Sequence, residues 1–255
     1  TQCLHAGYEQ AEATTKSHAA PLYRTTSYRF DSAEHANNLF TLKELGNIYT
    51  RLMNPTTDIL EQRVAALDGG AAALALASGT SAAFYSIINL ASKGDEIVSA
   101  NNLYGGTYTQ FNDILPSMGI TVKMVDPLNP ENFAAAITDK TKALFCEVVG
   151  NPLLDLVDLQ AIGDIAHAHG LPLIVDATFS TPALCRPLEH GADIVIHSLT
   201  KWLGGHGTVI GGIVVDSGKF DWTTGKHPLL SDPEPSYWNT SFANDLGDLA
   251  PLAYI

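Results

Sequence analysis

From about Thr57 onward, short apolar runs rich in β-branched residues alternate with segments whose apolar residues recur at helical spacing. This alternation is typical of strands that connect through helices into a mostly parallel sheet. The predicted strands cover 72–77, 96–99, 120–125, 142–149, 171–176, 193–197 and 209–215, and the predicted helices cover 58–68, 80–90, 107–117, 130–137 and 159–169. The expected fold is therefore a three-layer α/β/α domain around a sheet of about seven strands.

The first 56 residues differ, because they are rich in Thr, Ser, Tyr, Asn and His and hold few apolar runs. They predict an extended arm with one helix around 32–44. We expect three parts: residues 1–57 as an arm that contacts a neighbouring subunit, residues 58–240 as the main domain, and residues 241–255 as the start of a helix. Apolar residues continue at helical spacing to Ile255 without a capping residue, so that helix is expected to lead into a C-terminal domain absent from these residues. The Pro-rich stretch 222–238 is expected to be a second long surface segment.

The composition excludes several classes of function. Fourteen Lys and Arg residues stand against 27 Asp and Glu residues, a formal net charge of −13, so no broad basic surface is expected for nucleic acid or anionic membranes. No apolar run approaches the roughly 20 residues of a membrane span, and a cytoplasmic protein is expected. The three cysteines lie far apart and show no CxxC spacing, so neither a disulfide framework nor a structural zinc site is predicted. His167 and His169 point to different helix faces and are not predicted to bind a metal together.

Lys201 and Asp176 each follow a predicted strand. Ligands of open α/β sheets bind outside the carboxyl ends of the strands, which is where both side chains are expected. Partial desolvation would lower the pKa of Lys201 from its usual value of about 10.4 and make the amine nucleophilic toward aldehydes, although a solvated surface lysine is the alternative. Asp176 could hold a pyridinium nitrogen protonated, as pyridoxal chemistry requires, or it could simply cap a helix.

The turn Ser78-Gly79-Thr80-Ser81 lies between a predicted strand and a predicted helix. Small residues and free backbone N–H groups at the start of a helix can cradle the phosphate of a cofactor, although an ordinary helix cap would look the same. The glycines at Gly205 and Gly207 do not make a dinucleotide fingerprint, because the third glycine is missing and a strand follows them instead of a helix.

Seven ordered segments together resemble the γ-family of fold-type-I pyridoxal-phosphate (PLP) enzymes, which act on cysteine, homocysteine and methionine precursors. They are LHAGY (4–8), YTRLMNPT (49–56), SGTSA (78–82), NLYGGTY (102–108), EVVGNP (147–152), VDATFSTP (175–182) and HSLTKWLGGHG, which ends at Gly207. The resemblance spans nearly the whole chain. It implies that the main domain is the large, PLP-binding domain of that fold.

The resemblance also implies roles for individual residues. Lys201 would bind the cofactor covalently and later move protons, Asp176 would pair with the pyridine nitrogen, and Tyr104 would stack on the ring, which makes these three the catalytic residues. Asn151 would hydrogen-bond the ring hydroxyl. The remaining cofactor-binding residues implied are Ser78, Gly79, Thr80, Thr178, Ser198 and Thr200. Tyr49 and Arg51 would reach the phosphate in an adjacent subunit, which implies a homo-oligomer built as a dimer of dimers.

Two departures limit this transfer. Many relatives have Asn where Ala177 stands, and the family's C-terminal domain, which supplies an arginine for the substrate α-carboxylate, is absent from these residues.

Within the family, the segment Trp222–Trp238 resembles the homoserine-ester sulfhydrylases most, which implies conversion of O-acetylhomoserine and sulfide, or another sulfur donor, to homocysteine and acetate in methionine biosynthesis. Methionine γ-lyase and cystathionine γ-synthase or γ-lyase remain alternatives that use the same residues. Two further alternatives are a cofactor-binding sulfur-relay partner without turnover and a plain α/β scaffold that binds no cofactor.

Overall fold

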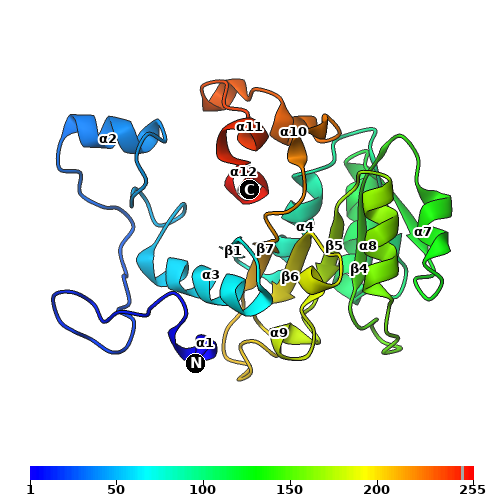
Figure 1. Cartoon of the computed structure of the whole chain (residues 1–255), viewed down its shortest axis with the longest axis horizontal. Coiled ribbons are helices and arrows are strands. Elements are labelled where there is room, and N and C mark those ends of the chain that lie inside the picture. The colour runs from blue at the N-terminus through cyan, green and yellow to red at the C-terminus, as the bar shows by residue number, and fades with distance from the viewer. Residues whose placement is uncertain (248–249) are drawn as a thin grey trace. The chain divides into compact units, whose positions relative to one another are not determined.

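A computed structural model describes residues 1–247 and 250–255 of the chain (Figure 1). The chain divides into two compact units, Thr1–Val64 and Ala65–Ile255. Among the described residues, no helix is long and apolar enough to cross a membrane.

The first unit holds little regular structure. It contains α1 (Gln2–His5), α2 (Ala33–Phe40) and most of α3 (Pro55–Asp68), which continues into the second unit. Helix α2 starts where the Ser32 side chain accepts a hydrogen bond from the backbone N–H of His35, and it ends four residues before the predicted end. The irregular backbone between the helices is held by side chains. The Thr56 hydroxyl, for example, accepts from the Tyr23 N–H at 2.9 Å and donates to the Pro21 carbonyl at 2.9 Å.

Seven strands form one sheet in the order β1-β7-β6-β5-β4-β2-β3. Their bounds are β1 Ala72–Leu76, β2 Glu96–Ala100, β3 Thr121–Val125, β4 Thr141–Glu147, β5 Leu173–Asp176, β6 Ile194–Ser198 and β7 Gly212–Asp216. Strand β7 runs antiparallel to both of its neighbours and the other pairs are parallel. No helix crosses over between β6 and β7, and a direct loop connection between neighbouring strands is compatible only with antiparallel pairing. The predicted mostly parallel sheet is confirmed.

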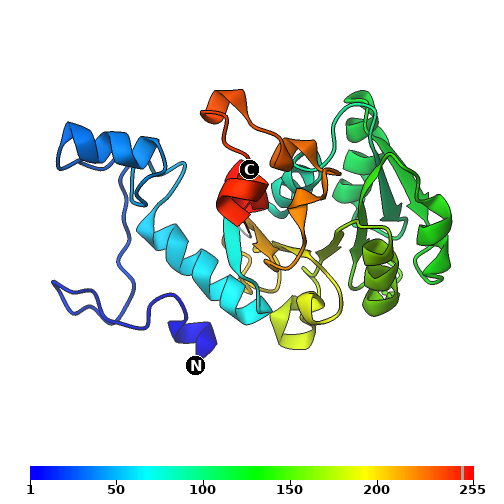
Figure 2. The ribbon, with the colours of Figure 1, turned by 45° about the horizontal axis from the view of Figure 1, so that its top comes forward.

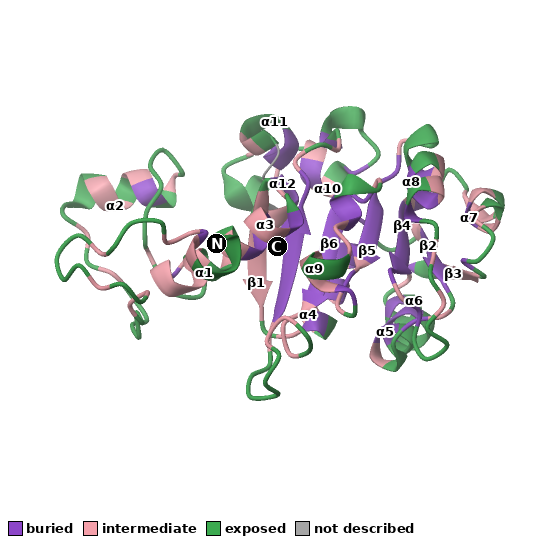
Figure 3. Ribbon diagram, turned by 60° about the horizontal axis from the view of Figure 1, so that its bottom comes forward, coloured by how far each residue is buried: buried purple, intermediate pink, exposed green. Residues whose placement is uncertain are grey.

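Helices cover both faces of this sheet. Figures 2 and 3 show the strands between α4 (Gly79–Ile88) and α8 (Leu159–Ala168). Helix α4 packs on β1, β6 and β7, α8 packs on β5, and α7 (Glu131–Ala136) packs on β2 and β3. The other helical segments of the second unit are α5 (Gly105–Thr109), a π-helical turn (Gln110–Ile114), α6 (Leu115–Ser117), α9 (Thr181–Leu184), α10 (Pro228–Ser231), α11 (Phe242–Leu246) and α12 (Ala250–Tyr254), with 3₁₀ turns at 187–189, 222–224 and 235–237.

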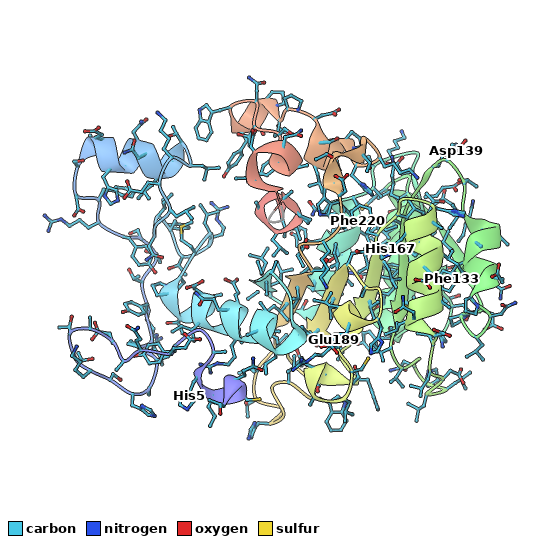
Figure 4. All side chains as sticks on the ribbon, in the orientation of Figure 1. His5, Phe133, Asp139, His167, Glu189 and Phe220 are labelled. Carbon is cyan, nitrogen blue, oxygen red and sulfur yellow. The ribbon has the colours of Figure 1, made fainter. Side chains whose placement is uncertain are left out.

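The core lies along the central strands β4, β5, β6 and β7, whose residues are almost all buried (Figure 3). Strands buried on both faces read as continuous apolar runs, which is how they were predicted from the sequence. Two histidine–carboxylate contacts brace the outer elements, one fully buried and one half-exposed. His197 on β6 meets Asp68 at the end of α3 at 2.7 Å, and His167 on α8, labelled in Figure 4, meets Asp193 at 2.9 Å.

The structure corrects three expected elements. Strand β7 begins at Gly212 instead of Val209, because Val209 and Ile210 are 61% and 77% exposed in a loop. The predicted helix 107–117 is interrupted by the π-helical turn. The segment Trp222–Trp238 is not simply a surface excursion, because Trp222 and His227 are 3% and 0% exposed and their rings pack edge-to-face with centroids 5.2 Å apart. In the predicted terminal helix, residues 248–249 lie outside the described part of the chain.

Candidate active site

The site forms at one edge of the sheet, where five parallel strands end. Ser78 follows β1, Tyr104 follows β2, and Glu147, Asp176 and Ser198 are the last residues of β4, β5 and β6. Parallel strands bring their carboxyl ends to the same edge, so polar residues far apart in the sequence converge there.

A cavity of about 610 Å³ opens at this edge, within the usual size range of a cofactor or small-molecule pocket. All of its lining residues belong to the second unit. Ten residues predicted from the sequence line it: Ser78, Gly79, Thr80, Tyr104, Asn151, Asp176, Thr178, Ser198, Thr200 and Lys201. The structure thus brings together one amine, one predicted carboxylate, several hydroxyls and a helix start around one space.

Asp176 is fixed at the end of β5 by hydrogen bonds to its neighbours. Its Oδ1 accepts from the backbone N–H of Thr178 at 2.8 Å, and the Thr178 hydroxyl in turn accepts from the backbone N–H of Ser198 at 2.7 Å. Burial raises the pKa of Asp176, while the hydrogen bonds from Thr178 oppose that shift. The nearest helix, α9, begins after Ser180, so Asp176 is not its N-cap. A carboxylate held in this way favours a cationic partner.

The turn at Ser78 serves both as a helix cap and as a wall of the cavity. The Ser78 hydroxyl accepts from the backbone N–H of Ser81 at 3.0 Å and starts α4. Gly79 packs so tightly on β6 that a Cβ atom would lie 2.5 Å from the Ser198 Cβ, and a Cβ on Gly212 would clash with the Ser78 carbonyl. These glycines let the start of a ten-residue helix approach the hydroxyls of Ser198 and Thr200. Backbone N–H groups and hydroxyls around a helix start favour a phosphate.

Lys201 lies in the turn after β6, where its backbone N–H donates to the Ser198 carbonyl at 3.2 Å. Its side chain lines the cavity but is exposed, so the expected desolvation is not found. Its neighbour Trp202 packs edge-on against Phe179 at 5.9 Å, and both rings line the same cavity. Lys201 is therefore accessible to a ligand that enters beside two aromatic rings.

Glu147 lines the cavity as well, and sequence reasoning had not assigned it a role. Its Oε1 accepts from the backbone N–H of Tyr104 at 2.6 Å. Burial first, and then the charge of Asp176, raise the pKa of Glu147 to about 8, while the hydrogen bond from Tyr104 lowers it. The sequence did contain a pattern that could have identified Glu147, because this residue, like Asp176, is a carboxylate in an otherwise apolar strand. The predicted strand 142–149, however, placed it two residues before the end.

Tyr49 and Arg51 lie in the first unit, where the Arg51 guanidinium sits 5.7 Å from the centre of the Tyr49 ring. They are not among the residues that line the cavity.

The cavity has the groups that a PLP molecule requires. The helix start and hydroxyls at Gly79 and Ser198 suit its phosphate, the carboxylate of Asp176 suits its pyridinium nitrogen, and Lys201 offers a primary amine to its aldehyde. The close packing at Gly79 and Gly212, where a Cβ atom would clash, does not depend on any sequence motif. It supports an anion-binding site at this helix start. The residues present therefore fit the cofactor.

Comparison with known proteins gives one family. A family model described as "Cys/Met metabolism PLP-dependent enzyme" matches residues 1–233. The O-acetyl-L-homoserine sulfhydrylase of Leptospira meyeri is 53% identical over 252 residues, a match that covers 99% of this chain and 57% of that protein. The chain thus spans a little more than half the length of this relative.

Solved structures agree with the sequence matches. A putative O-acetylhomoserine (thiol)-lyase from Campylobacter jejuni, whose structure contains N'-pyridoxyl-lysine-5'-monophosphate, superposes with a TM-score of 0.91 at 36% identity and covers 99% of this chain and 67% of that one. The cystathionine gamma-lyase of Lactobacillus plantarum, solved with L-serine, superposes with a TM-score of 0.77 at 38% identity and covers 85% of this chain and 54% of that one.

Proposed function

The chain belongs to the family of Cys/Met metabolism PLP-dependent enzymes, and from this membership we propose that the full-length protein makes homocysteine and acetate from O-acetylhomoserine and sulfide. The observation that carries the proposal is the cavity in which Lys201, Asp176 and the Ser78–Thr80 turn converge. The 53% identity to an O-acetyl-L-homoserine sulfhydrylase supports this branch of the family over the others.

The residues of this chain divide the work of the reaction. PLP, when bound, supplies an electron-withdrawing ring that stabilises negative charge on the substrate's α-carbon. The Ser78–Thr80 turn, Ser198 and Thr200 would hold the phosphate, and Asp176 would keep the ring nitrogen protonated. Tyr104 would lie against the ring. The Lys201 Nζ is the mobile base: it removes protons from the substrate's carbon chain and returns them after sulfide has replaced acetate at the γ-carbon.

The activity is tested by comparing substrates on full-length protein supplied with PLP. We expect kcat/KM for homocysteine formation from O-acetylhomoserine and sulfide to exceed that for elimination from methionine or cystathionine at least about 10-fold, the discrimination that one well-placed interaction gives. O-succinylhomoserine tests the acyl group in the same assay. A lyase rate equal to or above the sulfhydrylase rate would assign the protein to the lyase branch, to which the likeness to cystathionine gamma-lyase also points. A zero rate with all of these substrates would favour the sulfur-relay alternative.

We further propose that residues 58–240 form the PLP-binding domain and that the protein is a homo-oligomer, with Tyr49 and Arg51 in the arm (1–57) reaching the phosphate of an adjacent subunit. The support is that the exposed Arg51 and the half-exposed Tyr49 already lie together, with the guanidinium near the tyrosine ring. A cation and a hydroxyl side by side are suited to a phosphate.

Subunit mixing tests this arrangement. The Arg51→Ala and Lys201→Ala variants should each be nearly inactive alone. If Arg51 serves a neighbouring site, a co-refolded mixture of the two should regain activity, because some sites then combine an intact Arg51 from one copy with an intact Lys201 from the other. A mixture no more active than its components would show that Arg51 serves the site of its own chain.

A further inference from the structure

Glu147 and Asp176 are neighbours across two parallel strands. They are the last residues of β4 and β5, and they are directly paired in the register of the sheet. Paired residues of adjacent parallel strands point to the same face, and both side chains line the cavity. Two carboxyl groups so placed cannot both carry a charge without strong mutual repulsion.

Few other charges are available to relieve that repulsion. Among the residues that line the cavity, the titratable groups besides these two carboxyls are the Lys201 amine and the Tyr104 phenol. The charge of His197 on β6 lowers the pKa of Asp176 but is not among the groups that shift the pKa of Glu147. The thiol of Cys146, the residue before Glu147, is buried, and burial raises its pKa. Glu147 is only 7% exposed, so water does little to stabilise a negative charge on it.

The two carboxyls differ in the environment that holds them. Burial raises the pKa of Asp176, but hydrogen bonds from Thr178 and the charge of His197 oppose that shift. It would also face the pyridinium nitrogen of the cofactor. Glu147 has one such partner, the Tyr104 N–H. The single negative charge of the pair therefore belongs on Asp176 and the proton on Glu147.

The hydrogen bond from the Tyr104 N–H indicates a structural role for Glu147. Tyr104 is the residue before α5, and no cap hydrogen bond from its own side chain fixes that position. The 2.6 Å contact between its N–H and Glu147 Oε1 ties this backbone to the end of β4. Its ring packs against Gly106, where a Cβ would lie 2.6 Å from the Tyr104 Cε1, so the ring has little freedom on that side.

We propose that Glu147 is a positioning residue of the cofactor site: its carboxyl group stays protonated beside Asp176, which carries the negative charge of the pair, and its Oε1 holds the backbone of Tyr104. This inference rests on the proposed role of Asp176 and Tyr104 toward PLP. The protonation of the pair, however, can be measured on protein without the cofactor.

Infrared difference spectroscopy of cofactor-free protein tests the protonation. Wild-type protein at pH 6.5 should show a protonated-carboxyl band that is absent from Glu147→Gln and kept in Glu131→Gln, which removes an exposed carboxylate on α7. Because the pKa of Glu147 lies above that of an unfolded-chain glutamate, this proton is lost as the pH rises through about 8. A spectrum of Glu147→Gln identical to wild type at pH 6.5 would overturn the proposal, and it would do so without bearing on whether PLP binds.

Cofactor affinity tests the positioning. Glu147→Gln keeps a neutral oxygen acceptor for the Tyr104 N–H, so its dissociation constant for PLP should stay within about threefold of wild type. Glu147→Ala leaves that N–H without its acceptor and should weaken PLP binding about 10-fold or more. Equal losses in both variants would contradict a protonated Glu147, and no loss in Glu147→Ala would contradict its hold on Tyr104. Failure of wild-type protein to bind PLP would refute the proposed function instead.

Discussion

Replacing Lys201 by alanine is expected to abolish covalent attachment of PLP and to lower turnover by at least about 1000-fold. The variant loses both the proposed nucleophile and the proposed mobile base, and each contribution alone is worth two or more orders of magnitude. The cavity itself should persist, because the turn around Lys201 is held by backbone contacts to Ser198 and Gly205 that alanine keeps. The measurement is the visible absorption of the reconstituted protein, together with the rate of homocysteine formation.

A matched control separates this effect from general damage. Lys93→Ala removes another exposed lysine, one that does not line the cavity, and should leave both absorption and rate unchanged. Wild-type-like absorption in Lys201→Ala would mean that another amine holds the cofactor. If that absorption came with a preserved rate, the assignment of the mobile base would be wrong too.

Replacing Asp176 by asparagine is expected to lower turnover about 100-fold and to weaken PLP binding about 10-fold or more. Asparagine keeps an oxygen that can accept from the Thr178 N–H, so the end of β5 should stay folded. What it removes is the negative charge proposed to keep the ring nitrogen of PLP protonated, and charge-assisted hydrogen bonds of this kind contribute about 1.5–3 kcal/mol. The measurements are the dissociation constant for PLP and the kcat of the loaded protein.

Asp158→Asn is the matched control for this variant. Asp158 also accepts a backbone N–H, that of Ala161 at 3.0 Å, but it caps α8 away from the cavity and is exposed. It should change stability slightly and kcat not at all. If Asp176→Asn behaved like Asp158→Asn, the role of Asp176 would be that of a turn-forming residue, and another group would have to stabilise the charge on the ring.

The sequence was sufficient to predict where Asp176, Ser198 and Lys201 lie. An apolar run that ends in a polar residue marks the carboxyl end of a buried strand, and parallel strands bring these ends together. Glu147 was missed because the apolar pair Val148 and Val149 extends the run beyond the true end of β4. The antiparallel direction of β7 was likewise hidden, since periodicity records burial and not the direction of a strand.

The segment Trp222–Trp238 shows a different limit of sequence reasoning. Its prolines predicted a surface loop, but proline content says nothing about which side chains find a pocket. Trp222 and His227 pack edge-to-face, and the His227 Nε2 lies 2.8 Å from the carbonyl oxygen of Lys142, 85 positions away in the chain. Burial lowers the pKa of His227 to about 4, so the ring is neutral where it packs. Contacts this distant in sequence leave no local pattern.

We propose that PLP is attached to Lys201 in the cavity at the carboxyl edge of the sheet. This attachment is tested by reducing the PLP-loaded wild-type protein with borohydride, which converts a carbon–nitrogen double bond between cofactor and lysine into a stable single bond, and by mapping the modified peptide by mass spectrometry. We expect one pyridoxyl group per chain, on Lys201. A pyridoxyl group on a different lysine, or none at all after saturation with PLP, would contradict it.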